Sequence, residues 1–173
     1  QLTSSSKIDT ISLKNGNGKN NGNGGGAIYN WYASPVISNC KFYNNISSHK
    51  GGAISLCYSA SKIIKCTFIK NQALGNNSSD GGGAISNYYT ESVIENCLFQ
   101  ENKTNSGGGA IKGATNLSNS VFIANNASAG GGVCTGKNAI IENCMFVENT
   151  ANTGGGLYSA ETNVSIKSST FEH

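Results

Sequence analysis

The sequence predicts an all-β fold, a parallel β-helix (solenoid) of about six to seven coils. Three observations carry this prediction. A glycine motif recurs along the chain, an aromatic motif follows each copy, and the two motifs keep a nearly constant phase. The intervening residues are β-branched, aromatic, Gly or Asn, which is typical of short strands separated by bends. Repetition with a period of about 20 to 50 residues indicates a solenoid.

The glycine motif has the form GGAI or a close variant. Glycine suits a tight corner because it tolerates backbone angles that other residues avoid. The motif lacks a following GK[ST] and a helical pattern, so a corner is favoured over a phosphate-binding loop. Alignment on the glycines places Val133 and Leu157 in the column of the motif's alanine. The six copies are residues 24–28, 50–54, 81–85, 107–111, 130–134 and 154–158.

The aromatic motif has the form FxxN, with Phe-to-Phe spacings of 26, 31, 23, 24 and 25 residues. An Ile or Leu stands five residues before each Phe, and a Cys or Ser stands two before it. Coils stacked in register about 4.8 Å apart would align these side chains into ladders. The predicted ladders are Phe42, Phe68, Phe99, Phe122, Phe146 and Phe171; Asn45, Asn71, Asn102, Asn125 and Asn149; and Cys40, Cys66, Cys97 and Cys144.

A corner is predicted three residues before each Phe, where Asn is the commonest residue. In a straight strand, Ile94 and Asn96 would face one side while Cys97 and Phe99 faced the other, because side chains alternate. A bend at Asn96 turns both sets toward one interior, and Asn tolerates the left-handed conformation that such a bend requires.

The chain is predicted to form a single β-helix domain over residues 1–173. Residues 1–23 contain a degenerate first coil and a Gly/Asn-rich loop, and residues 24–173 contain the GGAI/FxxN coils. The segment NGNGKNNGNGGG, residues 15–26, is predicted to be a flexible loop. About five extra residues around 76–80 predict a longer, protruding loop.

The composition disfavours nucleic acid as a partner. Only 12% of residues are charged and the net charge is +3. Uncharged residues outside the apolar set are abundant, among them 25 Asn and 23 Gly. All 12 basic residues are Lys, and Arg supplies the bidentate contacts typical of nucleic-acid recognition. No apolar run reaches the length of about 18–20 residues that crosses a bilayer, so direct membrane insertion is not expected.

The cysteines allow two interpretations. Neighbouring coils would bring their Cα atoms within disulfide range, yet Ser120 in the same column favours small, buried, free thiols. Cys57 and Cys134 lie in other columns without in-register partners. The only histidines are His49 and His173, which leaves a zinc site or a Cys–His nucleophile unsupported.

The carboxylates do not indicate an active site. Glu95 and Glu142 share one column, and Glu101 and Glu148 share another, but an uncharged residue separates the members of each pair by about 10 Å. Solvated outward positions are therefore favoured over an acid/base dyad. We predict no enzyme activity, no catalytic residue, no cofactor and no metal ligand.

One aromatic column is a candidate binding strip. Four residues after the GGAI isoleucine come Tyr32, Tyr58 and Tyr89, flanked by Trp31 and Tyr88. If these side chains point outward, they suit sugar rings or a protein partner. Their parity with Ile54 and Leu56 instead favours core or a stabilising stack. The corresponding later positions are Thr115, Asn138 and Thr162.

The paired GGA[ILV] and FxxN motifs resemble the passenger domains of the chlamydial polymorphic membrane proteins and related adhesin-like β-helix proteins. Five or six copies in phase cover about residues 8–171. The resemblance implies a right-handed parallel β-helix, secreted or displayed on a cell surface, that acts in adhesion and often self-associates. It implies a host-cell or extracellular protein or glycan receptor as the partner.

Three functions remain open at this point. The first is a surface-displayed binding module without catalysis. The second is a self-assembling structural subunit that associates end to end, because an uncapped solenoid end is an open sheet edge. The third and weakest is a carbohydrate-active enzyme, which rests on fold analogy alone. In a eukaryote, Asn76 and Asn77 on the predicted loop would be glycosylation acceptors.

Overall fold

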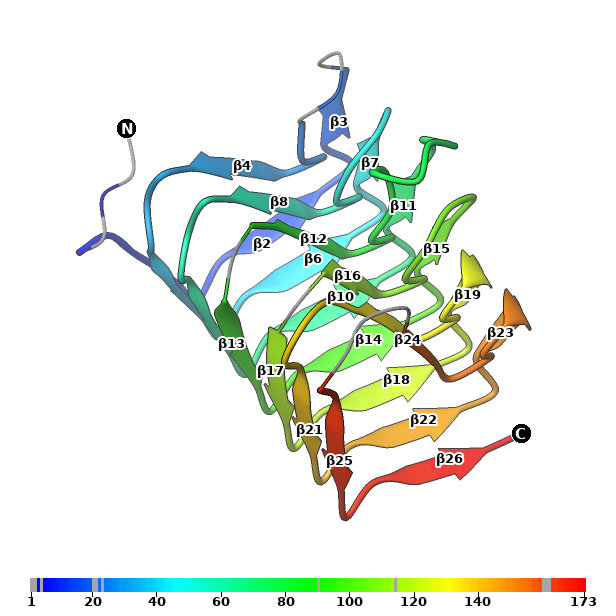
Figure 1. Cartoon of the computed structure of the whole chain (residues 1–173). Coiled ribbons are helices and arrows are strands. Elements are labelled where there is room, and N and C mark those ends of the chain that lie inside the picture. The colour runs from blue at the N-terminus through cyan, green and yellow to red at the C-terminus, as the bar shows by residue number, and fades with distance from the viewer. Residues whose placement is uncertain are drawn as a thin grey trace.

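The computed structural model describes residues 3, 5–19, 22, 24–89, 91–113, 115–159 and 163–173, with the backbone alone for Thr115. The regular elements of these residues are short β-strands, and every named strand pair is parallel. The strands stack as successive coils into a β-solenoid (Figure 1). The predicted all-β solenoid class is confirmed.

Four sheets, named A to D in the order in which the chain visits them, run along the solenoid. Sheets A and B have seven strands each. Sheet A consists of β1 (Lys7–Asp9), β5 (Val36–Ser38), β9 (Lys62–Ile64), β13 (Ser92–Glu95), β17 (Thr115–Ser118), β21 (Ile140–Glu142) and β25 (Ser165–Lys167). Sheet B consists of β2 (Ser12–Lys14), β6 (Lys41–Tyr43), β10 (Thr67–Ile69), β14 (Leu98–Gln100), β18 (Val121–Ile123), β22 (Met145–Val147) and β26 (Thr170–Glu172).

Sheets C and D have six strands each. Sheet C consists of β3 (Asn17–Gly18), β7 (Ile46–Ser47), β11 (Gln72–Ala73), β15 (Lys103–Thr104), β19 (Asn126–Ala129) and β23 (Thr150–Thr153). Sheet D consists of β4 (Ile28–Trp31), β8 (Ile54–Cys57), β12 (Ile85–Tyr88), β16 (Ile111–Gly113), β20 (Val133–Thr135) and β24 (Leu157–Ser159). Six to seven coils are therefore present, as predicted.

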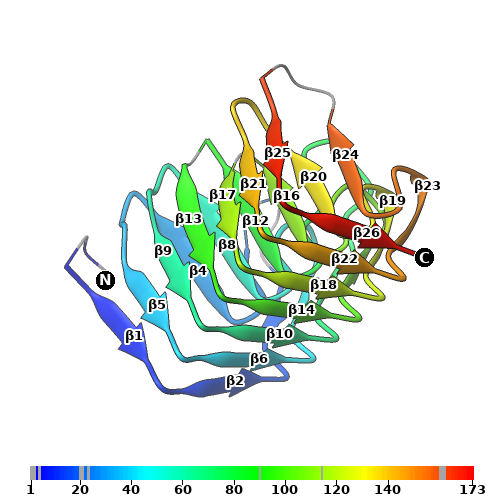
Figure 2. The same ribbon diagram turned by 90° about the horizontal axis from the view of Figure 1, so that it is seen from below.

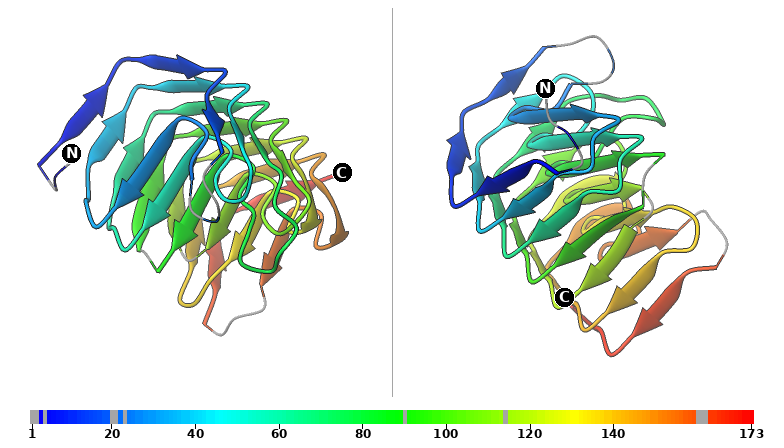
Figure 3. Two further views of the ribbon diagram at one scale, coloured as in Figure 1. Left: turned by 90° about the horizontal axis from the view of Figure 1, so that it is seen from above. Right: turned by 90° about the vertical axis from the view of Figure 1, so that its left-hand side faces the viewer.

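Each coil passes once through all four sheets, so a strand pairs with the strands four before and four after it. Figure 2 shows the strands of sheets A and B lying side by side in chain order, and Figure 3 shows the same order from two further directions. Sheets B and D form opposite layers of the coil (Figure 1). The side chains between the sheets form one continuous core.

Left-handed residues make the corners. The predicted corner between sheets A and B is confirmed, because the asparagines at this position have φ angles of 50–55°. They are Asn39, Asn96, Asn119 and Asn143. Lys65 and Ser168 adopt the same conformation at the equivalent positions. The glycine corner is also confirmed, because Gly82 has φ 69° and a Cβ there would lie 2.0 Å from the oxygen of Ile85. A further left-handed corner, between sheets B and C, includes Glu101 and was not predicted.

Aromatic and aliphatic ladders fill the interior in register. Phe42 pairs with Phe68, and the series continues without a slip to Phe171. Consecutive rings lie 4.6–4.9 Å apart between centroids with interplanar angles of 2–7°. Phe42, Phe68, Phe99, Phe122 and Phe146 have no exposed surface. Ile8 and Leu13 begin the same ladders, which confirms the degenerate first coil.

The predicted Asn ladder is a hydrogen-bonded chain within the core. Asn71 Nδ2 donates to Asn102 Oδ1 at 2.9 Å and to the oxygen of Phe42 at 3.0 Å. Asn71 N–H also donates to Asn102 Oδ1, at 3.0 Å. The other members of the ladder repeat this arrangement. Each amide is thereby satisfied in a place where an unpaired polar group would be costly. The described ladder consists of Asn45, Asn71, Asn102, Asn125 and Asn149.

One predicted column is wrong by a single residue. The glycine alignment places Val133 beside the alanines, but Val133 pairs with Ile111 and Leu157 pairs with Val133. Gly132 occupies the alanine position instead, since Ala110 N–H donates to its oxygen. The difference arises in the preceding turn: Gly107 bridges Ala129, while Lys103 pairs with Asn126, so the later coil is one residue shorter there.

The two predicted loops have different outcomes. Within residues 15–26, Asn17 and Gly18 form β3 and pair with Ile46 and Ser47, so that part of the loop prediction is wrong. Residues 20, 21 and 23 lie outside the described residues. Residues 76–79 are exposed, as predicted for the protruding loop. Asp80 closes this loop from a buried position, where its carboxylate accepts a hydrogen bond from Asn77 N–H at 3.0 Å.

The Asn ladder predicts a specific stability loss for Asn102→Ala. The substitution removes the acceptor of the buried Asn71 N–H and the donor to the oxygen of Phe68. We expect the free energy of unfolding to fall by about 3 kcal/mol, because buried polar groups are left unpaired. Urea denaturation followed by circular dichroism measures this change.

Asn105→Ala is the matched control. Asn105 is exposed, and its side chain donates to the oxygen of Leu74 at 3.4 Å. We expect its substitution to change stability by less than about 0.5 kcal/mol. Equal losses for the two variants would contradict the assigned role of the ladder.

Candidate functional site

The aromatic column lies at the corner between sheets D and A and is built by three backbone turns. Tyr32, Tyr58 and Tyr89 directly follow β4, β8 and β12, and their φ angles are 58°, 51° and 53°. Tyr32 N–H donates to the oxygen of Cys57 at 3.1 Å, and Tyr58 N–H donates to the oxygen of Tyr88 at 3.1 Å. These hydrogen bonds between neighbouring coils therefore place each tyrosine directly beside the tyrosine of the next coil.

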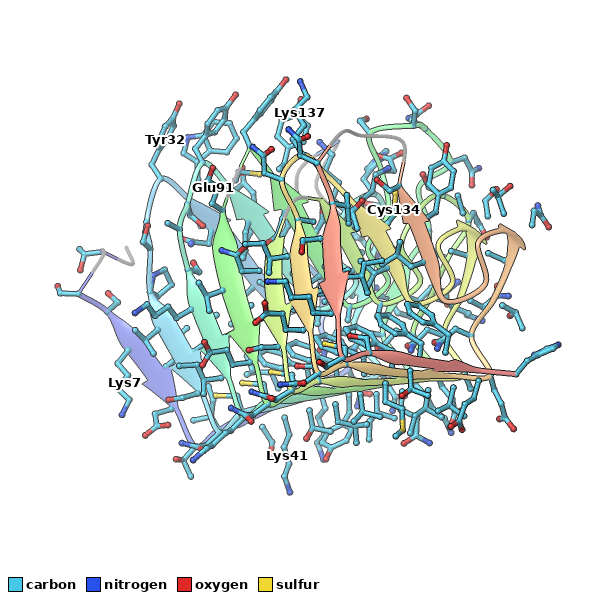
Figure 4. All side chains as sticks on the ribbon, turned by 60° about the horizontal axis from the view of Figure 1, so that its bottom comes forward. Lys7, Tyr32, Lys41, Glu91, Cys134 and Lys137 are labelled. Atoms are coloured by element: carbon cyan, nitrogen blue, oxygen red, sulfur yellow. The ribbon has the colours of Figure 1, made fainter. Side chains whose placement is uncertain are left out.

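The tyrosine rings point outward, and the interpretation of these residues as ordinary core is wrong. Tyr32, Tyr58 and Tyr89 are 68%, 41% and 70% exposed. Figure 4 shows Tyr32 projecting away from the ribbon. The parity argument fails because the tyrosine is itself the left-handed corner residue, so strand alternation does not continue to its side chain.

The sequence analysis gave a stabilising stack as the alternative to core, and the three tyrosine rings do form such a stack. The centroid distances are 5.0 Å from Tyr32 to Tyr58 and 5.4 Å from Tyr58 to Tyr89, with interplanar angles of 11° and 17°. The inner ring faces are occupied by this stacking. A ligand would therefore meet the ring edges, the hydroxyl groups and the outer faces of the stack.

Three further aromatic residues extend this surface, which we call the aromatic corner. Trp31 contacts the rings of Tyr32 and Tyr58 edge-on, at 5.4 and 5.6 Å. Tyr88 contacts Tyr89 in the same manner at 4.4 Å. Tyr29, which the sequence prediction missed, lies 6.1 Å from Trp31 and is 39% exposed. Tyr29 and Trp31 are two residues apart on one strand, so their side chains face the same side of the sheet, and this spacing could have identified Tyr29 from the sequence.

The electrostatics of the aromatic corner are mild. Lys50 Nζ lies 4.2 Å from the centroid of the Tyr88 ring, a cation–π arrangement with a nearly buried lysine. The neighbouring Tyr89 hydroxyl raises the pKa of Tyr88 above its ordinary value. Burial, followed by the nearby Cys57 thiol, raises the pKa of Tyr29. Tyr88 and Tyr29 therefore stay protonated at neutral pH and offer uncharged hydroxyl groups.

The tyrosine stack ends with Tyr89 and does not continue into the next coil, as predicted. The predicted successor residue, however, was the wrong one. Thr115 is not the successor of Tyr89, because it pairs with Ser92 in sheet A. The chain instead leaves sheet D at Gly113, whose φ is 109°. A Cβ at Gly113 would lie 2.0 Å from the oxygen of Asn87, so this turn runs against the preceding coil. Thr162 lies outside the described residues.

The cysteine column forms a hydrogen-bonded ladder of free thiols, as the favoured prediction held. Each thiol donates to the carbonyl two residues earlier, for example Cys97 Sγ to the oxygen of Glu95 at 3.2 Å. Ser120 Oγ makes the same bond, to Ser118 at 2.8 Å. Cys66 N–H in turn donates to Cys97 Sγ at 3.4 Å, and Cys97 N–H donates to Ser120 Oγ at 3.1 Å. Thiol and hydroxyl groups thus make the same hydrogen bonds in this ladder. The sequence prediction had considered only that these side chains are small and buried.

The remaining cysteines show no sign of activation. Cys57 pairs in register with Trp31 and Tyr88, and Cys134 pairs with Lys112 and Tyr158, so neither has a cysteine partner in the neighbouring coils. Burial raises the pKa of Cys57 and of Cys134 above the ordinary thiol value. A raised pKa keeps these thiols protonated and weakly nucleophilic near neutral pH.

The acidic residues are dispersed over the coils. Glu95 and Glu142 are separated in register by Ser118. Hydrogen bonds from Ser38 and Asn39, together with Lys7, hold the pKa of Asp9 at about 2, so Asp9 is ionised at neutral pH. Within the described part of the chain, no three His, Cys, Asp or Glu side chains are grouped as a metal site would require. In the same residues, no helix is long and apolar enough to cross a membrane.

Comparison with known families identifies two segments. Residues 39–56 and 96–114 match the Chlamydia polymorphic membrane protein repeat, and together they make up about one fifth of the chain. The chain carries repeats of the polymorphic membrane protein type. The first segment runs from the corner at Asn39 into β8, and the second runs from the corner at Asn96 through β16. Comparisons with curated proteins and with solved structures gave no match.

The repeat match therefore covers the scaffold and not the aromatic corner. Both segments contain the FxxN strand, its ladder Asn and the glycine corner, which are Phe42, Asn45 and Gly51 in the first copy. Tyr32, Tyr58 and Tyr89 lie outside the matched residues. The aromatic corner is therefore not part of the two segments that match the family's repeat.

The thiol ladder predicts different effects for two substitutions of Cys97. Cys97→Ala removes the acceptor of the buried Cys66 N–H, so we expect the free energy of unfolding to fall by about 1–3 kcal/mol. Cys97→Ser keeps a donor and an acceptor in place, and we expect less than half that loss. Thermal unfolding of both proteins under reducing conditions measures the difference. A serine variant as unstable as the alanine variant would show that sulfur volume, rather than hydrogen bonding, stabilises this position.

Proposed function

We propose that this protein is a non-catalytic, surface-displayed binding module that acts in adhesion. The resemblance to the polymorphic membrane proteins supports a surface-associated, adhesin-like role. The observation that carries the proposal is the aromatic corner: Tyr32, Tyr58, Tyr89, Trp31 and Tyr29 are each at least 39% exposed and together form one surface.

An exposed aromatic cluster on a β-scaffold favours a role in ligand recognition over a purely structural role. Tyrosine and tryptophan combine a large apolar area with a polar group and lose little conformational entropy on binding, so they dominate many contact surfaces. Here the rings are fixed by the stacking and by the left-handed backbone beneath them. Such prior order lowers the entropic cost of binding. An extracellular protein or glycan receptor would fit this surface.

The absence of catalysis in this proposal is supported by the spread of the carboxylates. Glycoside hydrolysis by the usual route needs two carboxylates about 5–10 Å apart on either side of a bound sugar. Glu95 and Glu142 lie two coils apart with Ser118 between them in register, so they stand side by side on one sheet and not on opposite sides of a bound sugar.

A triple variant tests the proposal: Tyr32→Asn, Tyr58→Asn and Tyr89→Asn. Asn accepts the left-handed corner conformation, so the coils should keep their register while the rings are lost. We expect binding of the labelled protein to cultured epithelial cells to fall at least tenfold in flow cytometry. A glycan array and a protease-treated cell sample distinguish a glycan receptor from a protein receptor.

Tyr158→Ser is the control, because Tyr158 lies on β24 and outside the aromatic corner. Its cell binding should equal that of the unchanged protein. If the triple variant keeps a native circular dichroism spectrum and still binds as well as the unchanged protein, the aromatic corner is not the contact surface.

A further inference from the structure

The aromatic corner differs in composition from an ordinary apolar patch. Its side chains are five tyrosines and Trp31, so each combines a ring with a hydroxyl group or an indole N–H. Side chains of this kind are enriched where an apolar phase meets water, because the ring can leave water while the polar group stays hydrated. The corner therefore has the chemistry of a group of interfacial anchors.

The shape of the corner is convex. Left-handed residues turn the chain from sheet D to sheet A, so the tyrosine rings project from the outside of a bend. Tyr32 points away from the ribbon in Figure 4. Stacking spaces the rings at 5.0 and 5.4 Å in a row along the solenoid. Such a row can meet a flat surface along its length, whereas small ligands usually bind in concave sites.

The stacking also limits the ligands that the rings can hold. A bound sugar normally packs on the face of an aromatic ring, but Tyr32 and Tyr89 cover the two faces of Tyr58. The row presents ring edges and hydroxyl groups instead. A flat interface needs only these groups, because the edges can leave water while the hydroxyl groups stay hydrogen-bonded.

Charge is balanced along this corner. In the described turns between sheets D and A, the charged residues are Glu91, two positions after Tyr89, and Lys137, in the turn between β20 and β21. Both are exposed, and Lys137 projects on the same side of the ribbon as Tyr32 (Figure 4). One carboxylate and one ammonium group give no net attraction to an anionic surface. They are complementary to headgroups that contain both an ammonium group and a phosphate.

We propose that the aromatic corner docks on the surface of a zwitterionic phospholipid bilayer, with its rings at the level of the headgroups. This inference rests on the proposed function, because it assigns the partner of the same surface. The ring edges leave water, while the hydroxyl groups, Glu91 and Lys137 stay among the hydrated headgroups. The contact is interfacial, so it requires no apolar run of the length that spans a bilayer.

The size of the corner sets the strength of this contact. The tyrosine row spans two coil spacings, about 10 Å, so only a few rings reach the bilayer. We expect weak, reversible binding, with a partition constant no greater than that of a single myristoyl chain, about 10⁴ M⁻¹. Salt should change this binding little, because screening acts on charges and few of them take part.

Trp31 is the only tryptophan of the chain and lies within the proposed contact, so its fluorescence reports binding directly. On addition of vesicles of phosphatidylcholine alone, we expect its emission to shift to shorter wavelengths. We also expect quenching by phosphatidylcholine that carries bromine in its acyl chains. Both effects should persist when the salt concentration is raised. These vesicles contain neither protein nor glycan, so a receptor of either kind is excluded as the cause.

Two variants show which surface makes the contact. The triple variant Tyr32→Asn, Tyr58→Asn and Tyr89→Asn keeps Trp31 as reporter and should lower the partition constant at least tenfold. Met145→Asn is the matched control, because Met145 and Trp31 are both 43% exposed and Met145 lies on sheet B, away from the corner. Its partition constant should stay within twofold of that of the unchanged protein. If the triple variant does not fold, quenching of Trp31 in the unchanged protein tests the contact by itself.

Three results would overturn the bilayer contact: an unchanged Trp31 spectrum, binding to anionic vesicles alone that is lost in high salt, or equal losses for the triple variant and Met145→Asn. The proposed function can fail separately. If the triple variant loses cell binding while vesicles leave Trp31 unchanged, the binding module stands with a protein or glycan receptor and the bilayer contact is refuted. If vesicles bind but cell binding does not depend on the tyrosines, the proposed function is refuted and the bilayer contact stands.

Discussion

The hydrogen-bonded column of buried asparagines is the constraint on which the rest of the structure depends. Each amide joins two coils by side-chain bonds of 2.9–3.0 Å and also satisfies backbone groups of both. A slip of one residue between coils would leave these donors and acceptors unpaired within the core. The phenylalanine stack is less selective, because apolar contacts tolerate a shift more readily than hydrogen bonds do. The asparagines therefore fix the register, and the phenylalanines fill the space that this register defines.

Most of the fold could be predicted because stacked coils repeat the same physical requirements. A position that needs an amide, a ring or a left-handed corner needs it in every coil, so a periodic sequence records the contact between coils. The prediction failed where a coil departs from its neighbours. Val133 was misaligned because one residue is missing from the turn before it, and glycine runs of equal length conceal that difference. Asn17 and Gly18 carry no strand signal, yet the neighbouring strand β7 pairs with them.

The candidate site was harder to predict than the fold, and the tyrosines show why. Strand alternation gives a side chain's direction only while the backbone stays extended. Tyr58 is the residue at which it stops being extended, so its parity with Leu56 carried no information. Tyrosine is also an uncommon residue in the left-handed region, where glycine and asparagine have the lower steric cost. The stacking of three rings offsets this cost at Tyr32, Tyr58 and Tyr89.

The loop that Asp80 closes shows how such a molecule can change its surface while keeping its core. Lys112 of the next coil donates hydrogen bonds to the carbonyl oxygens of Ser78 and Asp80, and His49 of the previous coil lies 3.5 Å from the Asp80 carboxylate. The strands on either side keep the pairing of their neighbours, because Gln72 pairs with Lys103 and Ile85 pairs with Ile111. An insertion at this corner therefore leaves the strand pairing between neighbouring coils unchanged. A lineage could lengthen, shorten or replace this segment as an exchangeable cassette, because the register of the coils does not depend on its length.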